Sequence, residues 1–140
     1  MMLTRRLGAV AAAVVTCVAF FVVAPPQASA VTYDYSMKTD DGDPGGIVKF
    51  AVDGDYVEIC DIEADGWAVQ VIVTQDAYGS RPALSYQMHV GGNGNCAVTS
   101  AATAGHNLYE DISAEFCVSL GKNGRYGYYV DCEPWYNGHF

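Results

Sequence analysis

The sequence predicts an all-β protein, a small disulfide-stapled β-sandwich of about seven or eight strands with an extended N-terminal segment. Short stretches in which polar and apolar residues alternate recur along the chain, and glycine-rich turns separate them. No stretch carries a helical apolar stripe of useful length. Four cysteines remain beyond an N-terminal leader, an even count that favours two disulfides in an exported domain.

Residues 1–30 have the three parts of an export signal. Arginines at positions 5 and 6 give a positive start, residues 7–24 are uncharged and apolar, and residues 28–30 (Ala-Ser-Ala) form a small-residue cleavage site. The alternative is an uncleaved membrane anchor, but the apolar run is at the short limit for crossing a bilayer. We expect cleavage, secretion of a chain that begins at Val31, and no membrane association afterwards.

The charge of the secreted chain narrows the range of partners. Two of the seven Lys and Arg residues leave with the signal peptide, so five face 16 Asp and Glu residues, a net charge of −11 with His neutral. Such a chain is repelled by nucleic acids and by anionic membranes, and we expect neither as a partner. A basic protein partner would suit it, although solubility alone also explains an acidic secreted protein.

The first residues of the secreted chain differ from the rest. Residues 31–37 alternate as a strand would, and residues 40–46 form a flexible acidic break. One interpretation is a peptide arm that docks in a partner, with Tyr33, Asp34, Tyr35 and Met37 as the binding residues. The alternative is an edge strand of the chain's own sheet. The predicted parts are a signal peptide (1–30), an extended N-terminal arm with an acidic linker (31–45), and a β-sandwich domain (46–140).

The centre of the predicted domain is a pair of strands around an acidic break. Residues 56–60 and 67–73 alternate polar and apolar side chains, which indicates strands with one buried face. Between them, Asp65 and Gly66 tolerate the positive φ that hairpin turns need. We therefore expect a β-hairpin here, with the valines of both strands buried and the rest of the domain packed around it.

Further strands follow the same pattern of alternation and turns. They are expected at residues 47–52, 84–90 and 96–99 and from about residue 112, with loops at 76–82, 91–95 and 100–107. Residues 116–120 and 126–132 look like the two arms of a hairpin around a turn at 121–124. No internal repeat is present.

The four cysteines of the secreted chain, Cys60, Cys96, Cys117 and Cys132, allow three disulfide pairings. We favour Cys60–Cys96 and Cys117–Cys132. The second pair flanks the last predicted hairpin, and Cys117 faces Cys132 if Leu120 faces Tyr129. Each bridge would stabilise the fold by roughly 3 kcal/mol according to the chain-entropy estimate.

The chain shows no catalytic constellation, and we expect it not to be an enzyme. Its three histidines, His89, His106 and His139, are dispersed, and no nucleophile-elbow motif accompanies them. Disulfide formation would leave no free thiol, and no C-x-x-C pair or phosphate-binding glycine loop occurs. We expect no cofactor, and a small hydrolase is the least favoured function.

One acidic stretch resembles the opening of an EF-hand calcium loop. Asp61, Glu63 and Asp65 occupy its first, third and fifth positions and Gly66 its sixth. Ile72 stands at the twelfth position, where the EF-hand requires a bidentate glutamate, so the stretch is not an EF-hand. A looser Ca²⁺ site on the three acids remains an alternative to a solvated turn.

Aromatic residues gather near the ends and turns of the predicted strands, a distribution that suits either a docking surface or a lid folded over the sandwich. They are Tyr33, Tyr35, Tyr126, Tyr128, Tyr129, Trp135 and Tyr136.

Several short motifs resemble a group of small secreted proteins of filamentous soil bacteria. The motifs are residues 46–50 (GIVKF), 55–61 (DYVEICD) and 64–66 (ADG), followed by three further cysteines. Members of this group resemble the linking subunit of umbrella toxin particles, which are large secreted antibacterial assemblies. The resemblance implies a β-sandwich that joins a lectin-bearing subunit to a toxin-bearing subunit, with its N-terminal segment inserted in a partner.

Three functions follow from these observations. The favoured one is a secreted non-catalytic adaptor that links other secreted proteins in an antibacterial toxin particle. The alternative is a free-standing secreted binding module, either an enzyme inhibitor or a binder of Ca²⁺ or glycans. The third is the small hydrolase.

Overall fold

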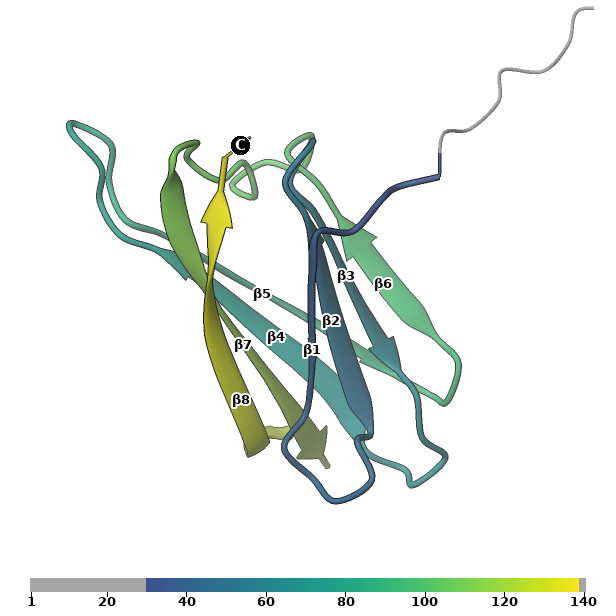
Figure 1. Ribbon diagram of the computed structural model, residues 1–140. Helices are drawn as coiled ribbons and strands as arrows, with labels where there is room; N and C mark the ends of the chain where they lie inside the picture. The colour runs from purple at the N-terminus through teal and green to yellow at the C-terminus, as the bar shows by residue number, and fades with distance from the viewer. Residues whose placement is uncertain (1–29, 139–140) are drawn as a thin grey trace, which may run out of the picture.

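The computed structural model describes residues 30–138. Except for Ala30, the predicted signal peptide lies outside this range, as do His139 and Phe140. The described chain is all-β, with eight strands in two antiparallel four-stranded sheets that face each other (Figure 1). The predicted fold class is therefore confirmed. No helix within residues 30–138 is long and apolar enough to cross a membrane.

The two sheets take their strands from interleaved parts of the chain. Sheet A has the order β1 (Tyr35–Lys38), β2 (Gly46–Ala51), β3 (Tyr56–Asp61) and β6 (Cys96–Thr99). Sheet B has the order β5 (Leu84–Gly91), β4 (Ala68–Gln75), β7 (Ile112–Lys122) and β8 (Arg125–Asn137). The chain therefore crosses between the sheets after β3, after β5 and after β6, as in Greek-key sandwiches.

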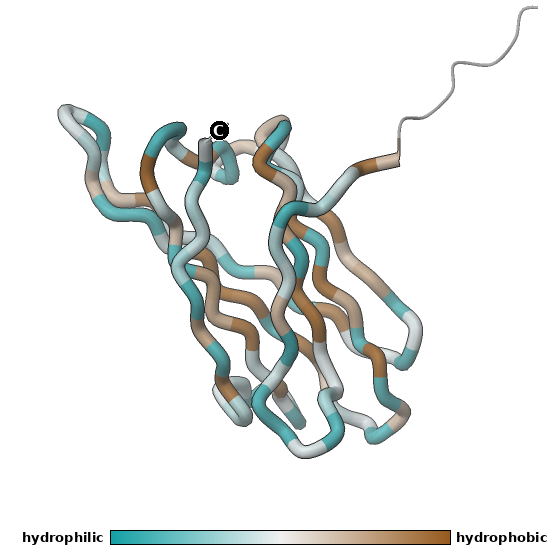
Figure 2. The backbone as a smooth tube through the Cα atoms, in the orientation of Figure 1, coloured by the Kyte–Doolittle hydropathy of each residue, from teal (hydrophilic) through white to brown (hydrophobic). Residues whose placement is uncertain are grey.

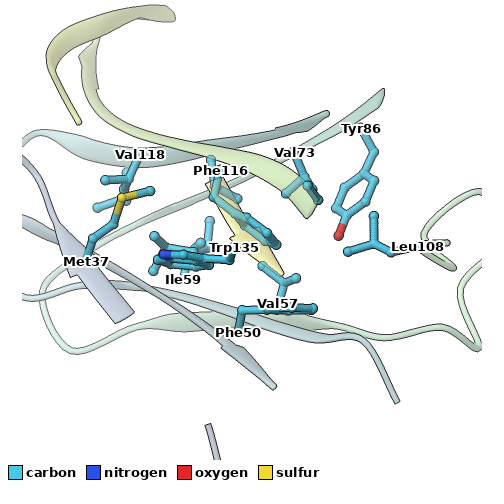
Figure 3. Packing of buried hydrophobic residues seen from close by; sticks show 14 of the residues in the cluster. Met37, Phe50, Val57, Ile59, Val73, Tyr86, Leu108, Phe116, Val118 and Trp135 are labelled. Carbon is cyan, nitrogen blue, oxygen red and sulfur yellow. The ribbon is translucent and has the colours of Figure 1, made fainter. Parts of the chain in front are cut away.

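The core lies between the sheets and follows the predicted alternation. Sheet A contributes fully buried Val48, Phe50, Val57 and Ile59, and sheet B contributes Val69, Val71, Val73, Phe116 and Val118. In Figure 2, hydrophobic residues (brown) recur along the strands of both sheets. Figure 3 shows Trp135 lying between the layers, with its ring centroid 4.5 Å from that of Phe116. Burial of these alternate side chains is the main force that holds the sheets together.

The predicted hairpin of residues 56–73 is wrong. Strand β3 belongs to sheet A, where it pairs with β2 and β6, and strand β4 belongs to sheet B, where it pairs with β5 and β7. Because each strand already has two neighbours, neither has a free edge for the other. The turn itself exists, with Gly66 at φ +78°, but it carries the chain across the core.

Both predicted disulfides, Cys60–Cys96 and Cys117–Cys132, are present. Cys60 faces Cys96 across β3 and β6, and Cys117 faces Cys132 across β7 and β8. The assumed partner of Leu120 is wrong by one residue, because Leu120 faces Tyr128. Two register irregularities in β7–β8 separate the tight turn from the cysteine pair. A β-bulge of this kind adds a residue to one strand and shifts the pairing.

Of the two interpretations of the N-terminal residues, the structure contains the edge strand. Residues 35–38 form β1, which pairs antiparallel with β2. The predicted domain boundary at residue 46 thus falls between two paired strands of sheet A. The acidic break is also ordered, because the Asp41 carboxylate accepts hydrogen bonds from Thr39 Oγ1 (2.5 Å) and Gly45 N (3.1 Å).

The sheets approach each other closely at Gly46. A Cβ atom at this position would lie 2.8 Å from a methyl group of Val69, which is fully buried in sheet B. Gly46→Ala is therefore expected to lower the free energy of unfolding by about 1–3 kcal/mol, measured by urea denaturation. Gly42→Ala is the matched control, because a Cβ there meets nothing within 4 Å. Equal stability of the two variants would contradict this packing.

Candidate functional site

Two of the four predicted partner-binding residues are anchored in the chain's own core. Met37 is 7% exposed and belongs to the hydrophobic cluster. The ring of Tyr35 stacks on Trp135 at 5.5 Å and lies 6.2 Å from Phe50. These side chains hold β1 against the sandwich, because exposing them would lose their burial free energy.

The other two, Tyr33 and Asp34, make polar contacts with the domain. The Asp34 carboxylate accepts a hydrogen bond from Val52 N at 2.8 Å. Tyr33 donates a hydrogen bond to Glu58 at 3.2 Å, and the ammonium group of Lys49 lies 5.4 Å from its ring centroid. Partial burial, with the nearby Glu58 carboxylate, raises the pKa of Tyr33 to about 12. These contacts align the chain just before β1.

The residues ahead of Tyr33 leave the sandwich. Val31 and Thr32 are exposed, and Figure 1 shows this part of the chain extending away from both sheets. With Ala30, Asp53 and Tyr56 they border a hollow of about 310 Å³. The part of the N-terminal segment that is open to a partner therefore precedes the residues that the sequence singled out.

The three candidate calcium ligands are held by local backbone contacts. Asp61 is 1% exposed, and its carboxylate accepts hydrogen bonds from Gly92 N (2.7 Å) and Glu63 N (3.3 Å). Asp65 accepts one from Trp67 N at 2.8 Å. Desolvation and neighbouring carboxylates raise the pKa of Glu63. Among residues 30–138, no group of three or more His, Cys, Asp or Glu residues is arranged to hold a metal ion.

The two described histidines make separate local contacts. His106 Nδ1 lies 2.6 Å from Thr99 Oγ1, and its ring stacks on Tyr86 at 4.0 Å. His89 stacks on Tyr126 at 5.6 Å. The third histidine of the hydrolase hypothesis, His139, lies outside the described residues.

An open pocket lies beside the β7–β8 turn, and we call it the hairpin pocket. It encloses about 490 Å³ and is lined by Trp67, Lys122, Asn123, Arg125 and Tyr128. The Trp67 ring meets Tyr128 edge-on, with 5.2 Å between centroids. The ammonium group of Lys122 lies 5.4 Å from the Trp67 centroid. The pocket thus combines aromatic surface with two cationic side chains.

Unusual backbone conformations build the hairpin pocket. Asn123 and Gly124 have φ values of 54° and 74°, as a tight two-residue hairpin turn requires. Tyr129 has a φ of 53°, which is rare for a bulky residue, and it lies in the irregular part of β8. Its ring is 6.0 Å from that of Trp67. β-Bulges often redirect side chains at functional sites, and this one turns consecutive tyrosines toward Trp67.

Sequence reasoning found only part of the hairpin pocket. It noted Tyr126, Tyr128 and Tyr129 as aromatic residues near a turn, but it placed Trp67 in a different hairpin. The crossing from β3 to β4 is what brings Trp67 beside β8. Trp135 has another role, because it is 3% exposed and packs in the core, where it is neither a lid nor a docking surface.

A buried polar centre lies at the opposite end of the sandwich. Asp55 is 1% exposed, and its carboxylate accepts hydrogen bonds from Leu108 N (2.8 Å) and Asn137 Nδ2 (3.0 Å). Burial is the main cause that raises the pKa of Asp55. The hydroxyl group of Tyr86 is buried without a hydrogen-bond partner, and burial, with the nearby Asp55, raises its pKa as well. These contacts join the β2–β3 turn to the end of β8.

Comparison with known proteins finds no relative of this chain. No protein-family model, curated protein or solved structure matches the chain. A functional proposal therefore depends on the chemistry of the described residues, together with the resemblance noted in the sequence.

Burial of Asp55 predicts an unusual pH dependence of stability. Its pKa in the folded chain is above the ordinary value of 3.8, so protonated Asp55 favours folding. This stabilisation is complete below pH 3.8 and is lost as the pH rises through the raised pKa. Asp55→Asn removes the titration and costs about 1–3 kcal/mol through a poorly matched hydrogen bond.

Urea denaturation at several values from about pH 4 to pH 7 measures this effect. The stability advantage of the wild type over Asp55→Asn is expected to shrink as the pH rises. An advantage that stays constant or grows with pH would show that burial does not control this carboxyl group.

Proposed function

We propose that this chain is a secreted, non-catalytic adaptor that joins other secreted proteins through its N-terminal segment. The observation that carries the proposal is the exposed segment at Val31 and Thr32, which extends away from the sandwich two residues ahead of edge strand β1. Such a segment can reach a partner without any change in the core.

The anchoring of β1 supports this role. Tyr35 and Met37 fix the strand by packing against the core, and a hydrogen bond from Val52 N fixes Asp34, the residue just before the strand. The segment ahead of them therefore starts from a defined position, which lowers the conformational entropy that a partner must overcome. Because β1 ends sheet A, its backbone also offers an edge to which an extended peptide can add.

The remaining features agree with an extracellular binding protein. Two disulfides suit an oxidising compartment, as does the predicted signal peptide. The four cysteines are consumed in the bridges, and the two described histidines engage local partners. A non-catalytic role requires none of these groups to react.

The resemblance to umbrella toxin linking subunits specifies the proposed partners. In that setting the chain would join a lectin-bearing subunit to a toxin-bearing subunit of an antibacterial particle. The exposed residues 31 and 32 would then enter one of these partners, and Tyr35 and Met37 would remain in the chain's own sandwich.

Affinity purification of the tagged secreted chain from its native culture supernatant tests the adaptor role, with mass spectrometry to identify partners. Large secreted proteins are expected in a fixed ratio to the chain. Val31→Asp with Thr32→Asp should remove at least one of them, because two buried charges at an interface are strongly unfavourable.

The matched control carries the same charge change in the exposed loop before β7, as Ala102→Asp with Ala104→Asp. It should retain the complex, and both variants should melt at the temperature of the wild type. A wild-type chain that elutes alone would refute the adaptor role. A complex that survives the N-terminal substitutions would refute the role of the segment.

A further inference from the structure

The hairpin pocket concentrates positive charge on an acidic protein. The described residues include five cations, which are Lys38, Lys49, Arg81, Lys122 and Arg125. Among residues 30–138, the ion pair between Lys49 and Glu58 is the only one within 4.0 Å. Lys122 and Arg125 therefore reach the pocket without a carboxylate from this part of the chain to neutralise them. A local excess of positive charge favours an anionic ligand.

Two of the side chains that line the pocket, Trp67 and Tyr128, are aromatic. Trp67 is half-buried, and the Tyr128 side chain is 45% exposed. Aromatic rings of this kind provide rigid contact area for the C–H faces of sugar rings at a low entropy cost. The nearby Asn123 adds an amide that can donate to and accept from hydroxyl groups.

The pocket is also preorganised. Both flanking strands are hydrogen-bonded up to Lys122 and Arg125, which face each other across the tight turn. The carbonyl of Tyr129 accepts a hydrogen bond from Asp40 N at 3.1 Å, which ties the bulge to the loop after β1. A bulky residue held at positive φ costs stability, and such strain gathers at binding sites.

We propose that the hairpin pocket binds an anionic saccharide, a sugar residue that carries a carboxylate or a phosphate group. The Arg125 guanidinium can grip such a group through two parallel hydrogen bonds, and the Lys122 ammonium adds a point charge above Trp67. The volume of about 490 Å³ suits a small ligand. This inference is independent of the adaptor role.

The surroundings argue against an acidic protein as the occupant. The backbone N–H of Asp40 donates a hydrogen bond to Tyr129 O, and the Asp65 carboxylate accepts one from Trp67 N, so acidic residues lie next to the residues that build the pocket. An acidic protein surface would cover these groups and be repelled over the screening distance of about 8 Å. A single sugar residue is smaller and would not need to cover them.

Calorimetry and tryptophan fluorescence of the secreted chain test the proposal. The chain has two tryptophans, and only Trp67 borders the pocket, because Trp135 is buried. The probes are galacturonic acid, its uncharged methyl ester, and glucose 6-phosphate. A charged probe should bind saturably and change the fluorescence, and Trp67→Phe should abolish that change. The charged probe that binds identifies the anionic group.

The decisive variant is Lys122→Gln with Arg125→Gln. It should weaken binding of the charged probe by roughly 10- to 100-fold and leave the melting temperature unchanged. Lys38→Gln with Arg81→Gln removes the same charge elsewhere and should bind as the wild type does.

Four results would overturn the saccharide site: no binding of either charged probe, equal binding of the methyl ester, equal losses in the two double variants, or displacement by an acidic peptide at equal concentration. The Lys122 and Arg125 variant should still purify with the adaptor's partners. Failure of the pocket proposal is thereby distinguished from failure of the adaptor role.

Discussion

Contact between aromatic rings of the two sheets determines where the other parts of this protein lie. Phe50 of sheet A meets Phe116 of sheet B at 4.9 Å, and Trp135 of β8 packs on Phe116 at 4.5 Å. Tyr35 of β1 then stacks on Trp135. The same cluster thus fixes both neighbouring edges of the sandwich. Both proposed binding surfaces depend on it, because one continues from β1 and the other is built on β8.

Local sequence patterns predicted the positions of the strands well, since the alternation of polar and apolar residues shows which side chains a strand buries. Val57 and Ile59 of β3 and the valines of β4 are buried as expected. The prediction that β3 pairs with β4 was wrong for a physical reason. Apolar alternation looks the same whether two strands lie in one sheet or face each other across a core. The disulfide between Cys117 and Cys132 was predictable because, in a regular hairpin, the residue numbers of facing residues add up to a constant. The register irregularities near the turn shift the partner of Leu120 by one residue, but Cys117 still faces Cys132.

The candidate sites were harder to predict, because they depend on long-range placement and backbone conformation. Tyr35 and Met37 look like anchors in the sequence, and they are, but they anchor β1 in its own domain. An apolar side chain gives no sign of which core it enters. The positive φ of Tyr129 and the approach of Trp67 to Tyr128 leave no sequence pattern of their own, although Gly127, at φ +95°, stands at one of the two register irregularities. Only the cluster of tyrosines near the turn was visible.

The arrangement of the two surfaces has a consequence for an adaptor, which needs contacts that do not compete. The N-terminal segment leaves one end of the sandwich, and the β7–β8 turn lies at the other end (Figure 1). Strand β1 runs between them, and the loop that follows it reaches the hairpin through the hydrogen bond from Asp40 N to Tyr129 O. The proposed protein partner of the segment and the proposed saccharide of the pocket would therefore not compete for one surface. A rigid sandwich with separate ends would then hold a glycan-bearing surface and a secreted partner at a fixed distance from each other.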